Sequence, residues 1–432
     1  MPDHLIISRA AVGSRMASPG IRAYQLAGAL GRALPGNEIT LAIPGSDDGI
    51  PAPAPNVRMQ QWASNGDALK LAREHPTTIS RNFQPHLLRL LGKRRFALDA
   101  YTPFYIEWME LSKNGMRGRR SWMSSNRWYL NLQLSMADYM FCADERQRDM
   151  WIGMLMALAL VPPDMYERDP SLRSFIDVVP YGVSPAPLVH TRPVLRGVVD
   201  GIGDNDRILI WNGSITDWND PFTLLEAMEH FATRRPEIKL VFLGVEHPDK
   251  VFDHTRGATQ RAIELARERG LEGRNVFVLH GWRPYEEIDN YLAESDMAVC
   301  LGYEDIESRF AFRTRYVDVL RARLPLLCTR GDVLAERAAA EPFGIAVAER
   351  DLNGVIAGIE RILDDAAFAE TCRERAAAVG AELSWDEVVK PLVRFCESGE
   401  SAAMPAARRV KQAWGRAGAY FALRELALVS PV

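Results

Sequence analysis

The sequence lacks the features that mark several large classes of protein. It holds five cysteines in 432 residues, and no C-x-x-C pair or cysteine–histidine cluster has zinc spacing. Its longest apolar run, residues 154–163, is too short to span a bilayer. Basic side chains number 52 and acidic ones 56, so the basic excess of a dedicated nucleic-acid binder is missing. No G-x-G-x-x-G motif follows a first strand, which argues against a nicotinamide dehydrogenase.

What is present suits the reducing compartment of a cell. The cysteines are odd in number and far apart, so we expect reduced side chains in apolar positions. Residues 1–7 lack a basic segment followed by a long apolar one, so we expect no signal peptide. Hydrophobic residues make up 47% and charged residues 25%, as in an ordinary soluble protein. We therefore expect a cytoplasmic protein, and its length predicts two domains.

Short apolar runs alternate with amphipathic stretches along almost the whole chain. Most runs do not alternate in polarity, which is typical of parallel strands covered on both faces. Repeated strand-then-helix order predicts two doubly wound, Rossmann-like α/β sheets that face each other across a cleft. The expected strands are residues 5–8, 39–43, 77–80, 96–100, 139–142, 177–179, 208–211, 240–243, 276–279, 297–301, 326–328 and 345–347.

A break in this series separates two halves of the chain. Residues 185–187 read Pro-Ala-Pro, and residues 197–206 are rich in glycine and aspartate, as in a linker. We predict three segments, with the C-terminal helices packing back on the first domain. They are a first domain over residues 1–190, a second domain over residues 191–385 and C-terminal helices over residues 386–432.

The C-terminal segment 405–432 combines five basic side chains and one acid with apolar residues at helical spacing. The favoured interpretation is a terminal helix that packs across the domains. The alternative is a basic amphipathic surface for an anionic lipid or a lipid-linked acceptor. That alternative predicts peripheral contact of a cytoplasmic protein with the inner face of a membrane.

The stretch that follows the run 208–211 joins a glycine loop to a helix start. Asn212, Gly213 and Ser214 end the strand, and Pro221 stands where a helix begins. Glycine lets the backbone approach a ligand, and free N–H groups near a helix start attract phosphate. Strand–glycine–helix turns occur throughout α/β proteins, so spacing alone favours a structural turn.

A second stretch, residues 304–329, concentrates positive charge after another predicted strand. Arg309, Arg313 and Arg315 stand near the start of an expected helix, whose first N–H groups also attract anions. Asp318 lies one turn further along, where a carboxylate could accept hydrogen bonds from sugar hydroxyls. The alternative is a solvated charged helix with ion pairs at i,i+3 spacing.

Together these stretches resemble the nucleotide-sugar domain of family 4 glycosyltransferases, which are retaining enzymes of the GT-B fold. The resemblance is strongest between residues 208 and 332. It implies that Asp318 holds the ribose, that amides of the segment 312–314 contact the diphosphate, and that the loop 281–282 lies beside the base. The predicted donor-binding residues are Gly213, Ser214, Gly281, Trp282, Glu304, Phe312, Thr314 and Asp318.

One departure from the family pattern concerns its pair of spaced glutamates. Asp318 falls on the second of them, whereas Phe310 occupies the position of the first. Glu304 or Glu307 could replace that first glutamate only if the loop is rearranged. The identity of the carboxylate at this point is therefore open.

A second departure concerns the positive charge that clamps the diphosphate in this family. The family's Gly-Arg pair and later lysine are absent, because Ser214 follows Gly213 and the next loop carries Asp217. We hypothesise that Arg313 or Arg315 supplies the missing charge.

The first half of the chain resembles the acceptor domain of these enzymes. Residues 8–27 match its first strand, glycine loop and helix, and the polar loop 99–101 stands where many relatives place a histidine. His247 and His280 end strands near the expected cleft, but neither has an orienting partner visible in the sequence. The predicted catalytic residues are Asp99, Arg313 and Arg315, and the predicted acceptor or cleft residues are Gly13, Arg15, Arg22 and Tyr101.

The expected reaction moves a sugar from a nucleotide-diphosphate sugar to a glycan, a lipid-linked molecule or a small molecule. Fixed amides, a helix N-terminus and arginines can stabilise the leaving diphosphate, and no Asp-x-Asp metal motif stands in a suitable loop. The resemblance implies retention, no metal, and the nucleotide sugar as co-substrate without a further cofactor. The alternative is a catalytically degenerate GT-B protein that binds nucleotide sugar or scaffolds a glycan-assembly complex. A sugar-nucleotide epimerase is less favoured, since no clear set of acid/base carboxylates and a histidine is present.

Overall fold

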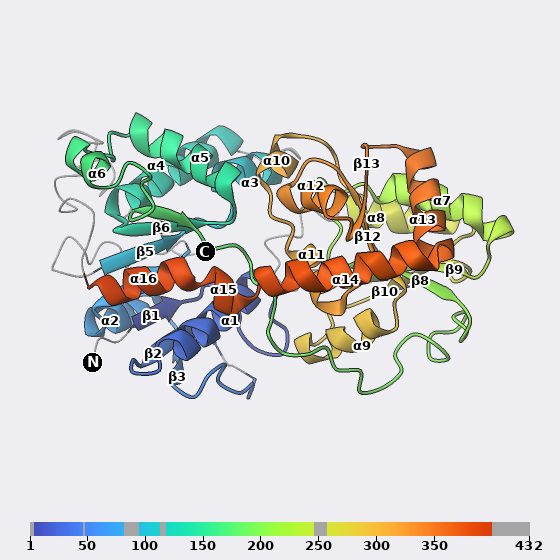
Figure 1. The fold of residues 1–432 in the computed structure, drawn as a ribbon, viewed down its shortest axis with the longest axis horizontal. Coiled ribbons are helices and arrows are strands. Elements are labelled where there is room, and N and C mark those ends of the chain that lie inside the picture. Colours follow the sequence, from blue (N-terminus) through green and yellow to red (C-terminus); the bar gives the residue numbers. More distant parts are fainter. Residues whose placement is uncertain (1–3, 46–47, 82–94, 113–117, 246–256, 400–432) are drawn as a thin grey trace. The chain divides into compact units, whose positions relative to one another are not determined.

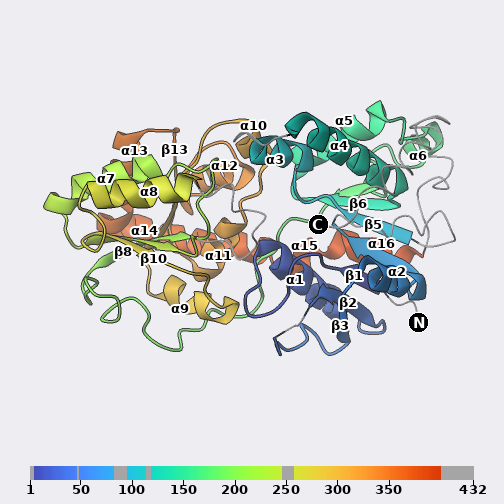
Figure 2. The same cartoon turned by 180° about the vertical axis from the view of Figure 1, so that it is seen from behind.

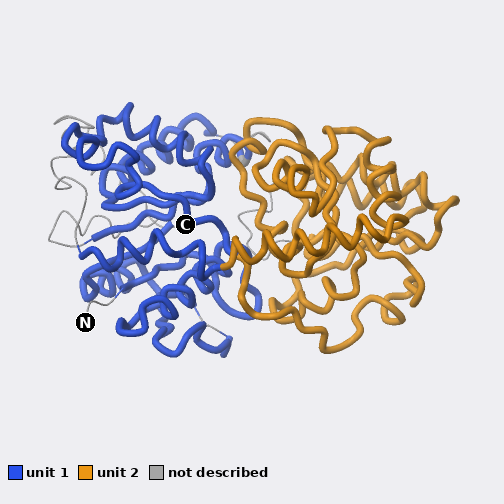
Figure 3. The backbone as a smooth tube through the Cα atoms, viewed as in Figure 1, with its two compact units in different colours: residues 1–182, 385–432 blue, residues 183–384 orange. Residues whose placement is uncertain are grey.

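The computed structural model describes residues 4–45, 48–81, 95–112, 118–245 and 257–399. The chain divides into two compact units, and Figure 3 colours them separately. Unit 1 comprises residues 1–182 and 385–432, and unit 2 comprises residues 183–384. The boundaries expected from the sequence fall after residues 190 and 385, and the segment 405–432 lies outside the described residues. In the described part of the chain, no helix joins the length and the hydropathy that crossing a membrane requires.

Unit 1 is built on a seven-stranded parallel sheet in the order β3-β2-β1-β4-β5-β6-β7 (Figure 1). Its strands are β1 (His4–Ile7), β2 (Ile39–Pro44), β3 (Val57–Trp62), β4 (Thr77–Ser80), β5 (Arg95–Asp99), β6 (Tyr139–Cys142) and β7 (Ile176–Val178). Its helices are α1 (Ser18–Ala33), α2 (Asn65–Glu74), α3 (Phe104–Leu111), α4 (Arg119–Met136), α5 (Glu145–Ala157), α6 (Pro163–Arg168), α15 (Trp385–Val388) and α16 (Lys390–Ser398).

The last two helices return to unit 1 and are held there by aromatic packing. Trp385 is fully buried, and a Cβ atom added to Gly182 would come within 2.6 Å of its ring. Phe395 of α16 stacks on Tyr139 at 4.8 Å between ring centres, with 11° between the rings. The guanidinium carbon of Arg95 lies 3.9 Å from the centre of the Phe395 ring. Large aromatic surfaces of this kind dominate the packing energy of such an attachment.

Unit 2 is built on a six-stranded parallel sheet in the order β10-β9-β8-β11-β12-β13. Its strands are β8 (Arg207–Asn212), β9 (Ile238–Leu243), β10 (Val276–Leu279), β11 (Met297–Cys300), β12 (Leu326–Thr329) and β13 (Gly344–Val347). Its helices are α7 (Pro221–Arg234), α8 (Gly257–Glu268), the 3₁₀ turn η3 (Tyr285–Glu287), α9 (Ile288–Ala293), α10 (Ile306–Phe310), α11 (Thr314–Ala322), α12 (Val333–Ala340), α13 (Leu352–Asp364) and α14 (Ala366–Glu382).

The unit 2 sheet is covered on both faces, as its apolar strands require. Helix α7 packs against α8 and α13, whereas α11 packs against α9 and α14. Figure 2 shows α7 and α8 in front of the sheet and α14 behind it. Helix α7 begins as the sequence predicts, with Pro221 in its first turn and the Asp220 carboxylate accepting from the N–H groups of Phe222 and Thr223. Both sheets confirm the expected parallel α/β architecture.

All twelve strands expected from the sequence overlap an observed strand, but the edge strand β3 was not among them. Half of its sequence, Val-Arg-Met-Gln-Gln-Trp, is polar, and its burial pattern is mixed rather than continuous. It pairs with β2 from Ile39–Val57 to Pro44–Trp62. An edge strand is covered on fewer sides, so its sequence need not form an apolar run.

Candidate functional site

The strand order of unit 2 places a switch point between β8 and β11. From β8 the chain proceeds through β9 to β10 on one side, and from β11 it proceeds through β12 to β13 on the other. In such sheets ligands bind beyond the carboxyl ends of the strands, at the place where the order reverses. The loops that leave β8 and β11 are therefore where functional side chains are expected.

Two glycines and an aromatic ring meet beside this switch point. Gly213 follows β8 with φ +110°, and Gly244 follows β9 with φ +70°, which are conformations that side chains disfavour. A Cβ atom added to Gly244 would lie 3.9 Å from the Cα of Gly213 and 3.7 Å from the ring of Trp282. Gly281, also at positive φ, has open space where its Cβ would stand. The backbone here is bare enough for a ligand to approach closely.

Arg315 supplies a cation at the same place. Its Nη2 donates to the carbonyl oxygen of Ser214 at 2.9 Å, and its guanidinium carbon lies 5.3 Å from the centre of the Trp211 ring. A Cβ atom on Gly213 would lie 3.8 Å from that guanidinium. The Nη1 atom of Arg315 is buried and makes no hydrogen bond with any described residue. A buried donor without an acceptor is costly, so this N–H group is suited to an added anion.

Asp318 joins the cluster from the second turn of α11. Its Oδ2 accepts a hydrogen bond from the Nδ2 of Asn212, at the end of β8, at 3.0 Å. Burial raises the pKa of Asp318 to about 6; the Asp289 carboxylate adds to this, while Arg321 and the Asn212 hydrogen bond oppose it. Arg321 itself is paired with Asp289 of α9. The site thus holds a carboxylate that is partly desolvated and incompletely compensated.

Arg313, two residues from Arg315, has a different environment. Its guanidinium forms an ion pair with Glu307, with Nη1 at 3.1 Å from Oε1, and also donates to the Ser308 hydroxyl at 3.0 Å. The side chains of Arg313 and Glu307 are only 12% and 5% exposed. Burial by itself would lower the pKa of Arg313, but the Glu307 and Asp332 carboxylates outweigh it and raise that pKa. The guanidinium is therefore compensated from within the protein.

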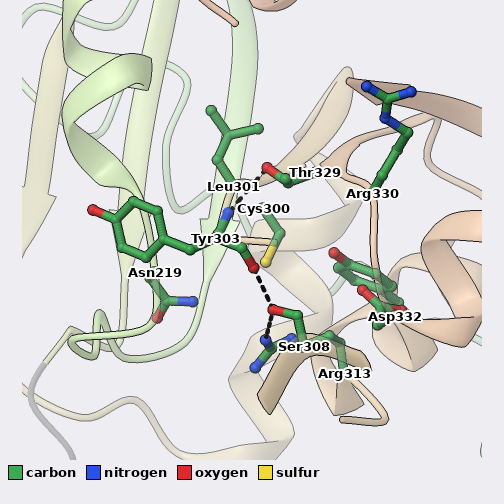
Figure 4. Close-up of a pocket in the computed structure, with 11 residues that line it drawn as sticks. Asn219, Cys300, Leu301, Tyr303, Ser308, Arg313, Thr329, Arg330 and Asp332 are labelled. Carbon is green, nitrogen blue, oxygen red and sulfur yellow. Dashed lines mark hydrogen bonds between the residues drawn. The ribbon is translucent and has the colours of Figure 1, made fainter. Parts of the chain in front are cut away.

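Figure 4 shows Arg313 and Ser308 beside a small hollow at the ends of β11 and β12, with Ser308 bonded to both Arg313 and the Tyr303 backbone. The hollow has a volume of about 10 Å³, which is room for one water molecule. Asp332 also lines it, and burial raises the pKa of this carboxyl to about 6, although it caps α12 through the N–H groups of Leu334 and Ala335. No sugar fits in this space.

The other predicted donor residues around α11 lie as follows. Glu304 is exposed on the loop after β11, where its carboxylate lies 3.7 Å from Arg330 and accepts from the backbone of Glu349. Phe312 is 8% exposed and Thr314 is the first residue of α11. The free N–H groups of the first turn of α11 therefore begin next to Arg315.

In unit 1, three predicted residues form one buried cluster. Arg22 of α1 donates to both carboxylate oxygens of Asp99, at 2.7 and 3.0 Å, and to two backbone carbonyls. Its guanidinium lies 4.4 Å from the centre of the Tyr101 ring, and the backbone N–H of Tyr101 donates to Asp99 at 3.2 Å. Burial raises the pKa of Tyr101, so its phenol stays protonated. Both oxygens of the Asp99 carboxylate are thus engaged by groups of unit 1, and its side chain is only 8% exposed.

The remaining predicted residues lie on the loop between β1 and α1 and at the end of β10. Gly13 is buried and its carbonyl accepts from the N–H of Met16, whereas Arg15 is exposed. His280 is exposed after β10, and His247 lies outside the described residues.

A larger hollow, of about 660 Å³, lies at the opposite edge of the unit 1 sheet, among residues that start β6 and β7 and residues of α16. None of the predicted site residues lines it. Two of its arginines, Arg173 and Arg394, both donate to Asp177, and Arg173 also pairs with Glu145. These ion pairs form within unit 1, and the sequence predicted no site at the amino ends of the strands.

Sequence reasoning missed Asp289, gave Gly244 no role, and named Asn212 only as part of a turn. It considered Arg321 as an i,i+3 partner of Asp318, whereas Arg321 forms its ion pair with Asp289. Gly244 directly follows an apolar run, which is the pattern that had drawn attention to Gly213. The Asp289–Arg321 pair joins α9 and α11 across 32 residues, and no local spacing indicates it.

Comparison with known proteins agrees with this geometry. Residues 199–379 match a family model described as "Glycosyl transferases group 1". A search of curated protein sequences returns no match. Many solved structures resemble the chain, all at low identity among those compared.

Three of these structures span almost the whole chain. A sucrose-phosphate synthase from Thermosynechococcus elongatus has a TM-score of 0.60 and 17% identity, covering 92% of this chain and 99% of its own. HepE from Anabaena, solved with UDP and glucose, has a TM-score of 0.63 and 13% identity, covering 92% and 100%. WaaG, a glycosyltransferase involved in lipopolysaccharide biosynthesis, has a TM-score of 0.57 and 14% identity, covering 91% and 99%. At these identities the likeness establishes the fold, which is GT-B.

Proposed function

We propose that this protein, whose residues 199–379 match the model of the group 1 glycosyl transferases, moves a sugar from a nucleotide-diphosphate sugar to an acceptor hydroxyl. The acceptor would be a glycan, a lipid-linked molecule or a small molecule. We further propose that transfer proceeds with retention, without a metal, and in the cytoplasm, with the segment 405–432 as the part that could touch a membrane surface. These finer points extend the family match and the resemblance to family 4.

One observation carries the proposal. At the switch point of unit 2, the bare backbone of Gly213 lies beside Arg315, which has a buried N–H without an acceptor among the described residues, and near the desolvated carboxylate of Asp318. In this arrangement the diphosphate lies over Gly213 and Gly244 beside Arg315. The ribose hydroxyls donate to Asp318, and the base lies beside Trp282. UDP and glucose are bound in the structure of HepE, which has the same fold.

The chemistry asked of these residues is charge stabilisation. The bond between the anomeric carbon and the diphosphate oxygen breaks, and negative charge grows on the leaving diphosphate. The oxygen of the acceptor hydroxyl bonds to that carbon, and its proton passes to the leaving diphosphate oxygen. A guanidinium and the first N–H groups of α11 are fixed before the reaction and can stabilise that charge. Because Asp99 already pairs with Arg22, the geometry favours Arg315 over Asp99 as the group that acts on the reaction.

The test compares the two neighbouring arginines. Purified protein is screened by thermal shift against UDP, GDP, dTDP and ADP and their common sugar conjugates, since a ligand that binds the folded state raises its melting temperature. With the nucleotide sugar that binds, Arg315→Ala should weaken binding about tenfold or more, the loss of a charged hydrogen bond.

Arg313→Ala is the matched control, because it removes the same charge from the start of the same helix. It should lower the melting temperature, since Glu307 is left buried without its partner, and should change the affinity of the folded protein little. The assignment is overturned if Arg313→Ala loses the donor and Arg315→Ala retains it. The absence of any nucleotide or nucleotide-sugar shift in the wild type would count against the function itself.

A second candidate is a degenerate GT-B protein that binds nucleotide sugar or scaffolds a glycan-assembly complex. Two observations favour it. Phe310 occupies the position of the family's first glutamate, and Arg313, one of the two candidate cations, is already paired with Glu307. Both candidates bind a nucleotide sugar, so binding does not separate them. Release of nucleoside diphosphate that depends on an acceptor supports the enzyme, and its absence across acceptor extracts supports the binding protein.

A further inference from the structure

Asn212 and Asp318 form a link across the switch point of unit 2. They lie 106 positions apart in the sequence, on β8 and α11, and the Nδ2–Oδ2 hydrogen bond is 3.0 Å long. Within the described part of the structure, the other carboxylate oxygen of Asp318, Oδ1, accepts no hydrogen bond. The pair therefore fixes one oxygen of the carboxylate and leaves the other available to a ligand.

Such a link is needed because position 318 holds an aspartate and not a glutamate. Aspartate has one methylene fewer than glutamate, so its carboxylate stays close to its helix, and a partner must come from the same helix face or from a neighbouring element. Its natural local partner is Arg321, at i+3 on the same helix face. That arginine is instead held by Asp289 of α9, with Nη1 at 3.2 Å from Oδ2. Asp289 thus occupies the competing cation, and Asn212 determines where the Asp318 carboxylate lies.

The charges around Asp318 make its ionisation sensitive to this arrangement. Helix α11 contributes Arg321, α9 contributes Asp289, β8 contributes the neutral amide of Asn212, and α14, which packs on α11, contributes none of the groups that shift it. Burial is the largest influence and raises the pKa of Asp318 to about 6, whereas the amide of Asn212 stabilises the ionised form. The carboxylate is therefore ionised above about pH 6 and protonated below it.

We infer that Asn212 is a positioning residue of the donor site, which holds the Asp318 carboxylate in place and in its ionised form, so that donor binding is linked to a proton. The inference rests on the proposed function and deepens it. An ionised carboxylate accepts hydrogen bonds from two hydroxyls, while a protonated one turns one oxygen into a donor. Binding of a ribose by Asp318 should thus weaken as pH falls through the pKa of this group.

The experiment measures the dissociation constant from pH 5 to pH 8 by calorimetry on the full chain. The probe is whichever of UDP-, GDP-, dTDP- or ADP-glucose binds the wild type most tightly. A sugar nucleotide is used because its diphosphate has no free terminal phosphate, whose own pKa near 6 would overlap that of Asp318.

Wild-type binding should weaken below about pH 6, with the slope of one proton. Asn212→Ala should bind about tenfold more weakly at pH 7.5, and the midpoint of its pH profile should move to higher pH, because the ionised form has lost a donor. Asp318→Asn should bind weakly at every pH and show no midpoint. A merely structural hydrogen bond would lower stability and leave the midpoint where it is.

Two control variants separate positioning from support of the fold. Asn275→Ala removes another buried amide of unit 2, which donates to the Met228 carbonyl at 2.7 Å at the amino end of β10. It should lower the melting temperature without moving the pH profile. The exchange Asn212→Asp with Asp318→Asn restores an amide–carboxylate bond between β8 and α11 but moves the charge to the strand. It should recover stability and leave donor binding impaired.

The inference is overturned if Asn212→Ala keeps the wild-type affinity and midpoint, or if the exchanged double variant binds donor as the wild type does. A failure of the proposed function looks different, since then no nucleotide sugar binds the wild type at any pH. In that event the inference falls with the function.

Discussion

The two units place charged residues at the same edge of their sheets but treat them differently. In unit 1, Arg22 and Asp99 meet at the carboxyl end of β5 and satisfy each other through two hydrogen bonds. In unit 2, Arg315 keeps a buried N–H without an acceptor among the described residues, and burial raises the pKa of the Asp318 carboxyl to about 6. Most buried polar groups of folded proteins are paired, and this N–H lies beside the bare backbone of Gly213, so we take it as a place suited to a ligand.

The same contrast recurs over two residues at the start of α11. Arg313 is compensated by Glu307, Ser308 and Asp332, whereas the partners of Arg315 among the described residues are the Ser214 carbonyl and the Trp211 ring, and neither carries a charge. A charge that the protein has already paired contributes to the fold, and a charge that it has left partly unpaired is available for chemistry. The difference lies in the partners of each residue and not in its type.

The largest effect that can break this comparison is expected at Asp99. Asp99→Ala leaves Arg22, which is 2% exposed, buried without a counter-charge, and should lower the free energy of unfolding by about 3–5 kcal/mol. The measurement is urea denaturation followed by circular dichroism. Folded Asp99→Ala protein should still bind the nucleotide sugar, because the donor residues belong to unit 2.

The control for this prediction replaces both partners. Arg22→Met with Asp99→Leu removes both charges and fills the space, and should be far less destabilising than either single loss. The exposed Arg32–Asp386 pair, at 2.6 Å, provides the reference for a surface ion pair, and Arg32→Ala should change stability by less than about 1 kcal/mol. An Asp99→Ala protein as stable as the wild type, but unable to transfer sugar, would instead favour the catalytic role predicted from the sequence.

The fold could be predicted largely from local sequence. Strands buried on both faces must be apolar throughout, so runs such as 240–243 and 326–328 identify themselves. The edge strand β3 escapes this logic, because Arg58, Gln60 and Gln61 are tolerated where one side of the strand faces less protein. It directly follows β2 in the order of elements and pairs with it in parallel, which no residue pattern within β3 records.

The residue types of the site could be predicted from the sequence, but the partners and the orientation of its side chains could not. Arg313 and Arg315 are indistinguishable in sequence, since both are arginines at the start of one helix. They differ in the structure because Glu307 of α10 pairs with Arg313 and neutralises its charge. Likewise the influence of Asn212 and Asp289 on Asp318 depends on contacts between segments far apart in the chain. Such contacts arise from the packing of elements, which sequence spacing does not encode.

The smallest effect, and the one of opposite sign, is expected from Asp318→Asn. The folded pKa of Asp318, about 6, lies above the unfolded value of 3.8, so the stability this group contributes is fully present below about pH 4 and is lost as pH rises through 6. At pH 7.5 the buried charge of Asp318 lowers the free energy of unfolding. Asparagine removes this charge and keeps an oxygen that can accept the hydrogen bond from Asn212. Asp318→Asn should therefore be more stable than the wild type by on the order of 1 kcal/mol at pH 7.5, and about equal to it at pH 4. Urea denaturation of the two proteins at both pH values measures the difference. A gain in stability together with a loss of donor binding would show that Asp318 serves function at a cost in stability. A loss of stability at pH 7.5 would show that Asp318 has a structural role, as Arg22 and Asp99 do.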